Sequence, residues 1–169
     1  MAKRTFSNVS WTPGAGVANG TTTNAPIMAL KGGSSTQLID MLEVMIEGQS
    51  GASSPTFLIW ARDSTIGVTP TALADPAHDG PMHPSTAALA APPVTYTTAS
   101  TLPTRSSTTS DAQLTFNLNT FGGIIRWAAS PYQQWSILGN TAQLGESSLS
   151  AFTGGTIGSV SSHIIYEPY

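Results

Sequence analysis

One group of side chains that could bind a metal ion consists of two histidines and an aspartate, His78, Asp79 and His83. Imidazole and carboxylate groups bind zinc, and the spacing His-x4-His suits one ion when a helix places both rings on one face. Gly80 and Pro81 stand between the two histidines and exclude such a helix, because proline lacks an N–H and glycine disfavours the helical state. Asp79-Gly80 is instead typical of a turn. We therefore expect no metal and no other cofactor.

The second group is formed by the carboxylates Asp40, Glu43 and Glu47. Glycoside hydrolysis needs two carboxylates across a cleft. On a helix these three would form an ordinary solvated face, and on a strand Glu43 and Glu47 would share one face. The sequence also has no Gly-x-Ser-x-Gly nucleophile motif and no phosphate-binding P-loop. We therefore predict that the protein is not an enzyme, and that His163, within the last apolar run, is a core or interface residue.

The overall charge and the absence of cysteine exclude further classes. With no cysteine, the chain can form neither disulfides nor thiolate metal sites. The net charge is −3 with a pI near 5.4, and the only basic pair is Lys3-Arg4, so we expect no nucleic-acid partner. No run approaches the length of about 18 apolar residues that a membrane-spanning helix needs, so we expect no membrane partner.

The elements that must position these side chains are predominantly β. The chain contains 23 Thr, 21 Ser, 16 Gly and 12 Pro; threonine favours strands, and the other three favour turns. Leu114, Phe116 and Leu118 alternate with polar residues, which is typical of a half-buried antiparallel strand. Further strands are predicted at 56–62, 94–98, 124–128, 135–138, 143–151 and 160–166, with a short helix at 84–91.

The segment 36–47 fits two structures. As a helix, it would place its apolar side chains on one face and its three carboxylates on the other. As a strand, it would place Val44 and Ile46 on one face, and Ile39 and Met41 on the other. We favour the strand, because it would form a hairpin with the next strand, whereas a helix would be alone among β elements.

Together these elements predict a mostly β protein: an antiparallel two-sheet sandwich, jelly-roll-like, with an extended N-terminal arm. Residues 1–30 would form the arm and a first irregular strand, and residues 31–169 the sandwich domain. Seven or eight strands separated by turn signals fit this class, and no repeated amphipathic helices indicate a βαβ fold.

The predicted surface is poor in charge. A monomer of 17.5 kDa exposes roughly 7,900 Å² by the usual scaling with mass. With six basic and nine acidic residues, this gives about one charge per 500 Å². Because solubility usually needs a denser charged coat, we expect partners to cover part of the surface. The alternative is an exterior rich in Ser and Thr that is soluble without charge.

Aromatic side chains near both ends of the chain are the candidate contacts. The four candidate interface residues are Phe6, Trp11, Tyr166 and Tyr169. The first two are anchors in an otherwise polar arm, and the last two would form a hook at the terminus. Trp60, Trp127 and Trp135 lie in apolar strands and are predicted to serve the core or a subunit contact, where a carbohydrate-binding module would expose such rings.

The blocks NTFGGIIRWAASP (119–131) and LGNTAQLGESSLSAFTGGTIGSVSSHIIYEP (138–168) resemble small virion proteins of tailed bacteriophages, of the capsid decoration (cement) or minor capsid type. The resemblance covers most of the chain and carries over no catalytic residue. It implies a protein that is assembled in the host cytoplasm and located in the virion. There it would decorate or stabilise the capsid through contacts with itself, as a trimer, and with the major capsid protein. A carbohydrate- or host-surface-binding β module of a phage fibre is the alternative.

Overall fold

The structure is a computed structural model of the chain. It describes residues 6–10, 26–69, 71–72, 80–81, 94–95, 102–105, 111–139, 145–151 and 160–168. In this part of the chain the secondary structure is almost entirely β, which confirms the predicted class. The strands are β1 (Phe6–Ser10), β2 (Met28–Lys31), β3 (Leu38–Gln49), β4 (Pro55–Thr65), β5 (Thr71–Ala72), β6 (Gly80–Pro81), β7 (Val94–Thr95), β8 (Thr104–Arg105), β9 (Ala112–Asn119), β10 (Phe121–Ala128), β11 (Trp135–Leu138), β12 (Glu146–Ala151) and β13 (Val160–Pro168).

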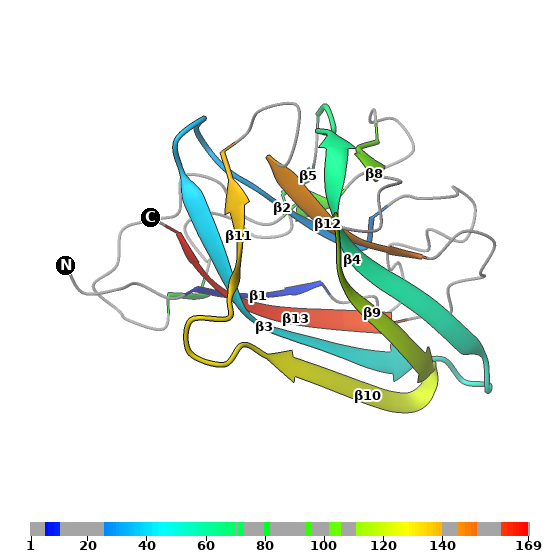
Figure 1. The fold of residues 1–169 in the computed structure, drawn as a ribbon. Coiled ribbons are helices and arrows are strands. Elements are labelled where there is room, and N and C mark those ends of the chain that lie inside the picture. Colours follow the sequence, from blue (N-terminus) through cyan, green and yellow to red (C-terminus); the bar gives the residue numbers. More distant parts are fainter. Residues whose placement is uncertain are drawn as a thin grey trace.

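Eight of these strands form two antiparallel sheets that enclose a core (Figure 1). The first sheet has the order β10-β3-β13-β1, with β6 beyond β1 and β11 pairing with β3 on the same side as β10. The second sheet has the order β9-β4-β12-β2, with β7 and β5 beyond β2 and β8 pairing with β4. Counted along the chain, the eight strands have the orders 6-3-8-1 and 5-4-7-2, the arrangement of a jelly roll. The predicted jelly-roll-like sandwich is therefore confirmed.

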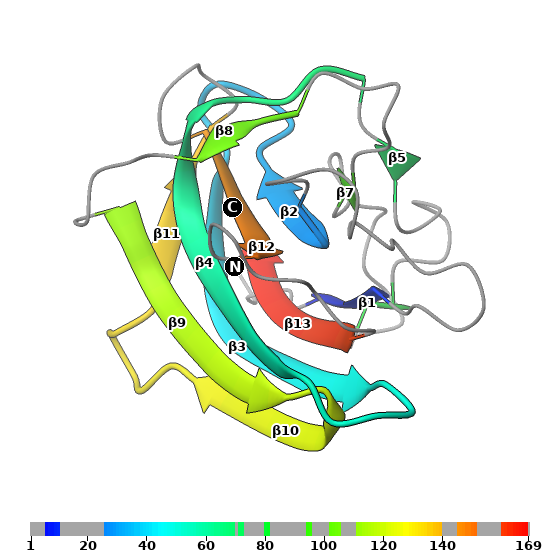
Figure 2. The ribbon, with the colours of Figure 1, turned by 90° about the vertical axis from the view of Figure 1, so that its right-hand side faces the viewer.

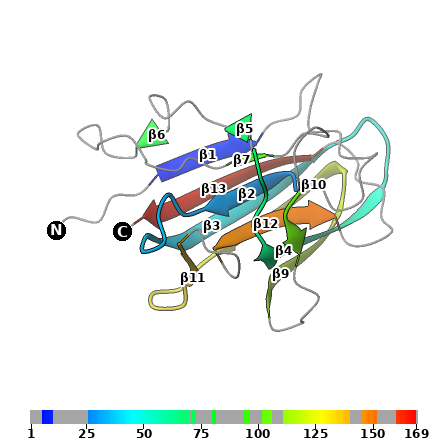
Figure 3. The same ribbon diagram turned by 90° about the horizontal axis from the view of Figure 1, so that it is seen from above.

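The stretch predicted as an arm and irregular strand contributes to both sheets. β1 pairs with β13 at five consecutive positions, beginning with Phe6 opposite Tyr166, and pairs with β6 on its other side. Seen from above, β1 lies beside β13 (Figure 3). β2 pairs with β12 in the second sheet. The described parts of residues 1–30 are thus strands of the sandwich itself.

Residues 38–47 of the ambiguous segment 36–47 lie in strand β3, as favoured. Its fully buried side chains are Ile39, Met41, Val44 and Ile46. The register against β13 shifts between Ile165 and Tyr166, which leaves Leu42 as the extra residue of a β-bulge. The predicted alternation placed the first two buried side chains and the last two on opposite faces. That prediction is wrong, because the bulge shifts the alternation by one residue and turns all four toward the core.

A large hydrophobic core fills the space between the sheets, and a second, small cluster contains Ala29 and Val94. The buried members of the large core are Ile27, Met28, Leu30, Ile39, Met41, Val44, Ile46, Leu58, Trp60, Phe116, Leu118, Ile137, Leu149, Val160, Ile164 and Tyr166. Burial of one large apolar side chain contributes about 1.5–3 kcal/mol, so this cluster supplies most of the favourable free energy of folding. In β9, Phe116 and Leu118 are buried whereas Thr115, Asn117 and Asn119 are exposed, which confirms the predicted alternation.

The two sheets are joined at one corner, where two connections cross from sheet to sheet beside each other (Figure 2). β3 leads into β4 through residues 50–54, and β9 leads into β10 through Thr120 alone. Ser50 N donates to the carbonyl of Thr120 at 2.8 Å, and Thr120 N and Oγ1 donate to the carbonyl of Ser54 at 2.9 and 3.0 Å. Asn119 Oδ1 accepts the backbone N–H of Ser54 at 3.2 Å. These bonds satisfy buried polar groups and fix the two connections to each other.

Two glycines at this corner give a matched test. A Cβ added to Gly48 would lie 2.5 Å from the backbone of Thr120, whereas a Cβ added to Gly51 would meet nothing within 4 Å. We predict that Gly48→Ala lowers the free energy of unfolding by about 1–3 kcal/mol, because the crossing connections must move apart. Gly51→Ala should stay within about 0.5 kcal/mol of the wild type.

Chemical denaturation of both variants, followed by circular dichroism, provides the measurement. Equal stability of the two variants would show that the corner is not closely packed.

Candidate functional site

One edge of the sandwich leaves the core partly uncovered. β4 lies between β12 and β9, and β3 lies between β13 and the strands β10 and β11, so β9, β10 and β11 are outermost on this side. Four apolar side chains that pack on the core are only partly buried, and all four come from these three strands. They are Leu114, Ile125, Trp127 and Trp135. We call β9, β10, β11 and these four side chains the open edge, because the core reaches the surface there.

Three tryptophans connect the centre of the core to the open edge. Trp60 is fully buried, and its ring centroid lies 6.4 Å from that of Trp135 at an interplanar angle of 45°. Trp135 in turn stacks on Trp127, with centroids 4.3 Å apart and planes 30° apart. Among the described residues, Nε1 of Trp60 and Nε1 of Trp135 are buried without a hydrogen-bond partner. The rings therefore serve the core and its edge, not a stacking platform on an exposed sheet face.

The structure describes only two of the four predicted interface residues, Phe6 and Tyr166. Tyr166 has no exposed surface and packs in the hydrophobic core. Its ring therefore serves the packing of its own chain. Phe6 occupies the position opposite Tyr166 in the neighbouring strand β1. Trp11 and Tyr169 lie outside the described residues. The structure thus brings two of the four positions together within one sheet.

The outer face of the first sheet carries most of the predicted chemistry-bearing side chains that the structure describes. Glu43 Oε1 and Oε2 accept hydrogen bonds from Nε and Nη2 of Arg126, at 2.9 and 2.7 Å. This bidentate contact lowers the pKa of Glu43, partial burial opposes the shift, and the positive charges of Arg126 and His163 add to it. Glu47 accepts from Ser161 at 3.5 Å, and Asp40 accepts from the Ser136 hydroxyl. These carboxylates bind neighbouring strands to one another.

The predicted metal-ligand candidates His78, Asp79 and His83 lie outside the described residues. Within the ranges that the structure describes, no three His, Asp or Glu side chains are grouped so that they could hold a metal ion. The same part of the chain has no helix with the length and apolar character needed to cross a membrane.

Two further carboxylates, Asp63 and Glu146, are buried side by side near the end of β4. The register of β12 against β4 places Glu146 next to Asp63, and both are fully buried. Asp63 Oδ1 accepts from the Ser148 hydroxyl at 3.0 Å, and Glu146 Oε2 accepts from the backbone N–H of Gly67 at 2.8 Å. Lys31 Nζ donates to the carbonyl of Gly67 at 3.3 Å. This buried polar cluster secures the end of β4, and no sequence motif marks it.

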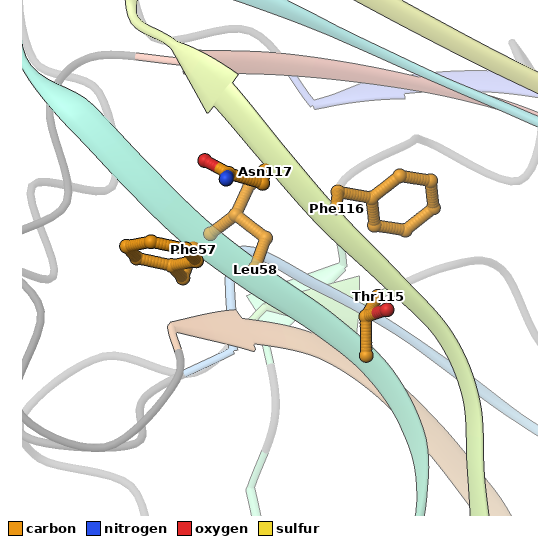
Figure 4. A pocket seen from close by; sticks show the side chains of 5 residues that line it. All are labelled: Phe57, Leu58, Thr115, Phe116 and Asn117. Atoms are coloured by element: carbon orange, nitrogen blue, oxygen red, sulfur yellow. The ribbon is translucent and has the colours of Figure 1, made fainter.

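A hollow lies beside the paired strands β4 and β9. It has a volume of about 340 Å³ and is lined by Phe57, Leu58, Thr115, Phe116 and Asn117 (Figure 4). The ring of Phe57 is 52% exposed, and Asn117 is its direct neighbour across the two strands. An exposed ring beside a hydroxyl and an amide is an arrangement that can bind a small amphipathic ligand.

Comparisons with known proteins identify no relative. No protein-family model, no curated protein and no solved structure matches this chain.

The Glu43–Arg126 pair generates a pH-dependent prediction. The pKa of Glu43 lies below its ordinary value of 4.5 in the folded protein, so the ionised carboxylate stabilises the fold above that pH. This stabilisation is lost as the pH falls through the lowered pKa. We therefore predict that Glu43→Gln is less stable than the wild type from neutral pH down to about 5, and that the difference vanishes on further acidification.

Urea denaturation at a series of pH values measures this difference. Arg126→Met supplies the control, because in that background Glu43→Gln should have little effect at any pH. A difference that is independent of pH would contradict the assigned contact.

Proposed function

We propose that this chain is a structural protein of a virus particle, which decorates or stabilises a bacteriophage capsid through contacts with copies of itself and with the major capsid protein. The observation that carries the proposal is the strand order of the two sheets, β10-β3-β13-β1 and β9-β4-β12-β2. Jelly rolls of this kind are typical of viral capsid domains and of lectins. The resemblance of residues 119–131 and 138–168 to small phage virion proteins favours the capsid.

The composition of the surface supports the proposal that this protein is part of an assembly. Large apolar side chains are exposed in the described residues although the whole chain has only 15 charged side chains. The exposed apolar residues are Leu38, Phe57, Val68, Phe121, Ile124, Tyr132 and Leu138. Single exposed apolar residues are ordinary, but here the core is also uncovered along the open edge. Contacts between subunits bury surface of this kind.

The proposal assigns no catalytic role to the carboxylates. Glu43 is engaged by Arg126, and Asp63 and Glu146 are buried inside the fold. Their hydrogen bonds connect strands and loop ends of the same chain. The proposed protein is accordingly not an enzyme and uses no cofactor.

The hollow beside Phe57 supports a second candidate, a carbohydrate-binding module. Aromatic faces stack on the apolar faces of sugar rings, and amide and hydroxyl groups such as those of Asn117 and Thr115 hydrogen-bond to sugar hydroxyls. In this alternative the protein would bind a host-surface glycan in the hollow beside Phe57.

The capsid proposal predicts that the chain is a stoichiometric component of particles. Particles from a culture that produces the protein would be purified on a density gradient and analysed by mass spectrometry. We expect the chain to band with the major capsid protein and to remain after washing in high salt, because its contacts are mainly apolar. Its absence from intact particles would contradict the proposal.

The glycan alternative predicts binding to a glycan array that is lost in Phe57→Ala and retained in Phe121→Ala, whose exposed ring lies outside the hollow. Loss of the stacking ring should weaken binding about tenfold or more. An array without any bound glycan would remove this candidate.

A further inference from the structure

We propose that two copies of this chain pair through β9, in antiparallel orientation across a two-fold axis, so that their second sheets join into one. This proposal rests on the self-association in the proposed function. It adds that β9 is the strand through which the copies associate.

β9 is an edge strand with little of the usual protection against pairing. Its one irregularity, a register shift against β4 that leaves Gln113 as an extra residue, lies near its start, and residues 114–119 run on without interruption. It spans eight residues, Ala112–Asn119, with no charged residue and no proline. β4 pairs with one side of it, and no described strand pairs with the other. Natural proteins normally interrupt such an edge with a charge, a proline or a bulge. The neighbouring edge strand β10 has two of these devices, a register shift between Phe121 and Ile124 and the exposed side chain of Arg126.

The side chains of β9 suit an identical partner. Leu114, Phe116 and Leu118 face the core, and Thr115 and Asn117 face outward. A two-fold axis perpendicular to the sheet keeps each face on its own side. The apolar row of one copy would then continue into the apolar row of the other. Self-pairing brings like residues close together, and a strand without charges incurs no repulsion.

The open edge explains why pairing would be favourable. Leu114 lies on β9 itself, and Trp127 and Trp135 lie on the facing strands of the first sheet. A second copy placed against β9 brings its own open edge to the same place. The partly exposed rings of the two copies would cover each other, which removes apolar area from water in addition to adding strand hydrogen bonds.

Sedimentation velocity of the purified protein tests the pairing. We expect a dimer that dissociates on dilution. Thr115→Lys combined with Asn117→Lys places lysines on the outward face of β9, where both positions are exposed. In the paired state these lysines would lie close to those of the second copy, so the dimer should be weakened about tenfold or more. Ser34→Lys combined with Ser35→Lys adds the same charge at exposed positions of the connection between β2 and β3 and should leave the dimer unchanged.

Cross-linking provides a second measurement that does not depend on weakened association. The chain has no cysteine, so Thr115→Cys combined with Asn117→Cys introduces thiols on β9 alone. With the two-fold axis placed at Phe116, Thr115 of one copy lies opposite Asn117 of the other, at about 4.5–5.5 Å between Cβ atoms. Mild oxidation should therefore convert most of the dimer into a covalent species that reducing agent reverses.

The outcomes separate this pairing from the proposed function. A wild-type monomer at high concentration, a trimer, or a dimer that neither responds to the lysines nor cross-links would overturn pairing through β9. A trimer or a differently paired dimer would leave the capsid proposal standing. A monomer would remove its self-contacts, and the contact with the major capsid protein would still be decided by whether particles contain the chain.

Discussion

The corner at which both sheets meet constrains the rest of the molecule. Thr120 is the entire connection between β9 and β10, and its backbone is bonded on both sides to the residues that connect β3 to β4. Because of this contact, β9 must stay beside β4 while β10 stays beside β3. The two strands diverge from the corner into different sheets, and the space between them is where Leu114, Ile125, Trp127 and Trp135 remain partly exposed. The same constraint that closes one corner therefore leaves the adjacent edge open.

Much of the fold could be predicted from local pattern. Alternation identified β9, and the strands near 56–62, 124–128, 135–138 and 160–166 lie where they were predicted. The face assignment in β3 failed for a physical reason. A bulge inserts one residue without any mark in composition, so the alternation of Ile39 and Met41 is out of phase with that of Val44 and Ile46. Pairing of β1 with β13 could not be derived either, because it joins residues at opposite ends of the chain.

The candidate site was less accessible to sequence reasoning than the fold. Tyr166 was chosen because it lies near the terminus, yet strand register places it in the core. Trp127 and Trp135 were correctly assigned to strands, but their stacking depends on β10 and β11 pairing successively with one strand. The proximity of Asp63 and Glu146 likewise depends on the pairing of β4 with β12. In each case the decisive contact joins residues far apart in the sequence, and residue type alone does not predict such a contact.

The central proposal for the assembly of this protein is that a second copy completes the sandwich along the open edge. Amide hydrogen exchange of residues 112–119, measured at low and at high protein concentration, tests that claim most directly. The account predicts that amides of β9 that exchange readily in dilute protein become protected as concentration rises, while amides of β13, which is paired on both sides, are protected throughout. Exchange in β9 that does not change with concentration would contradict it.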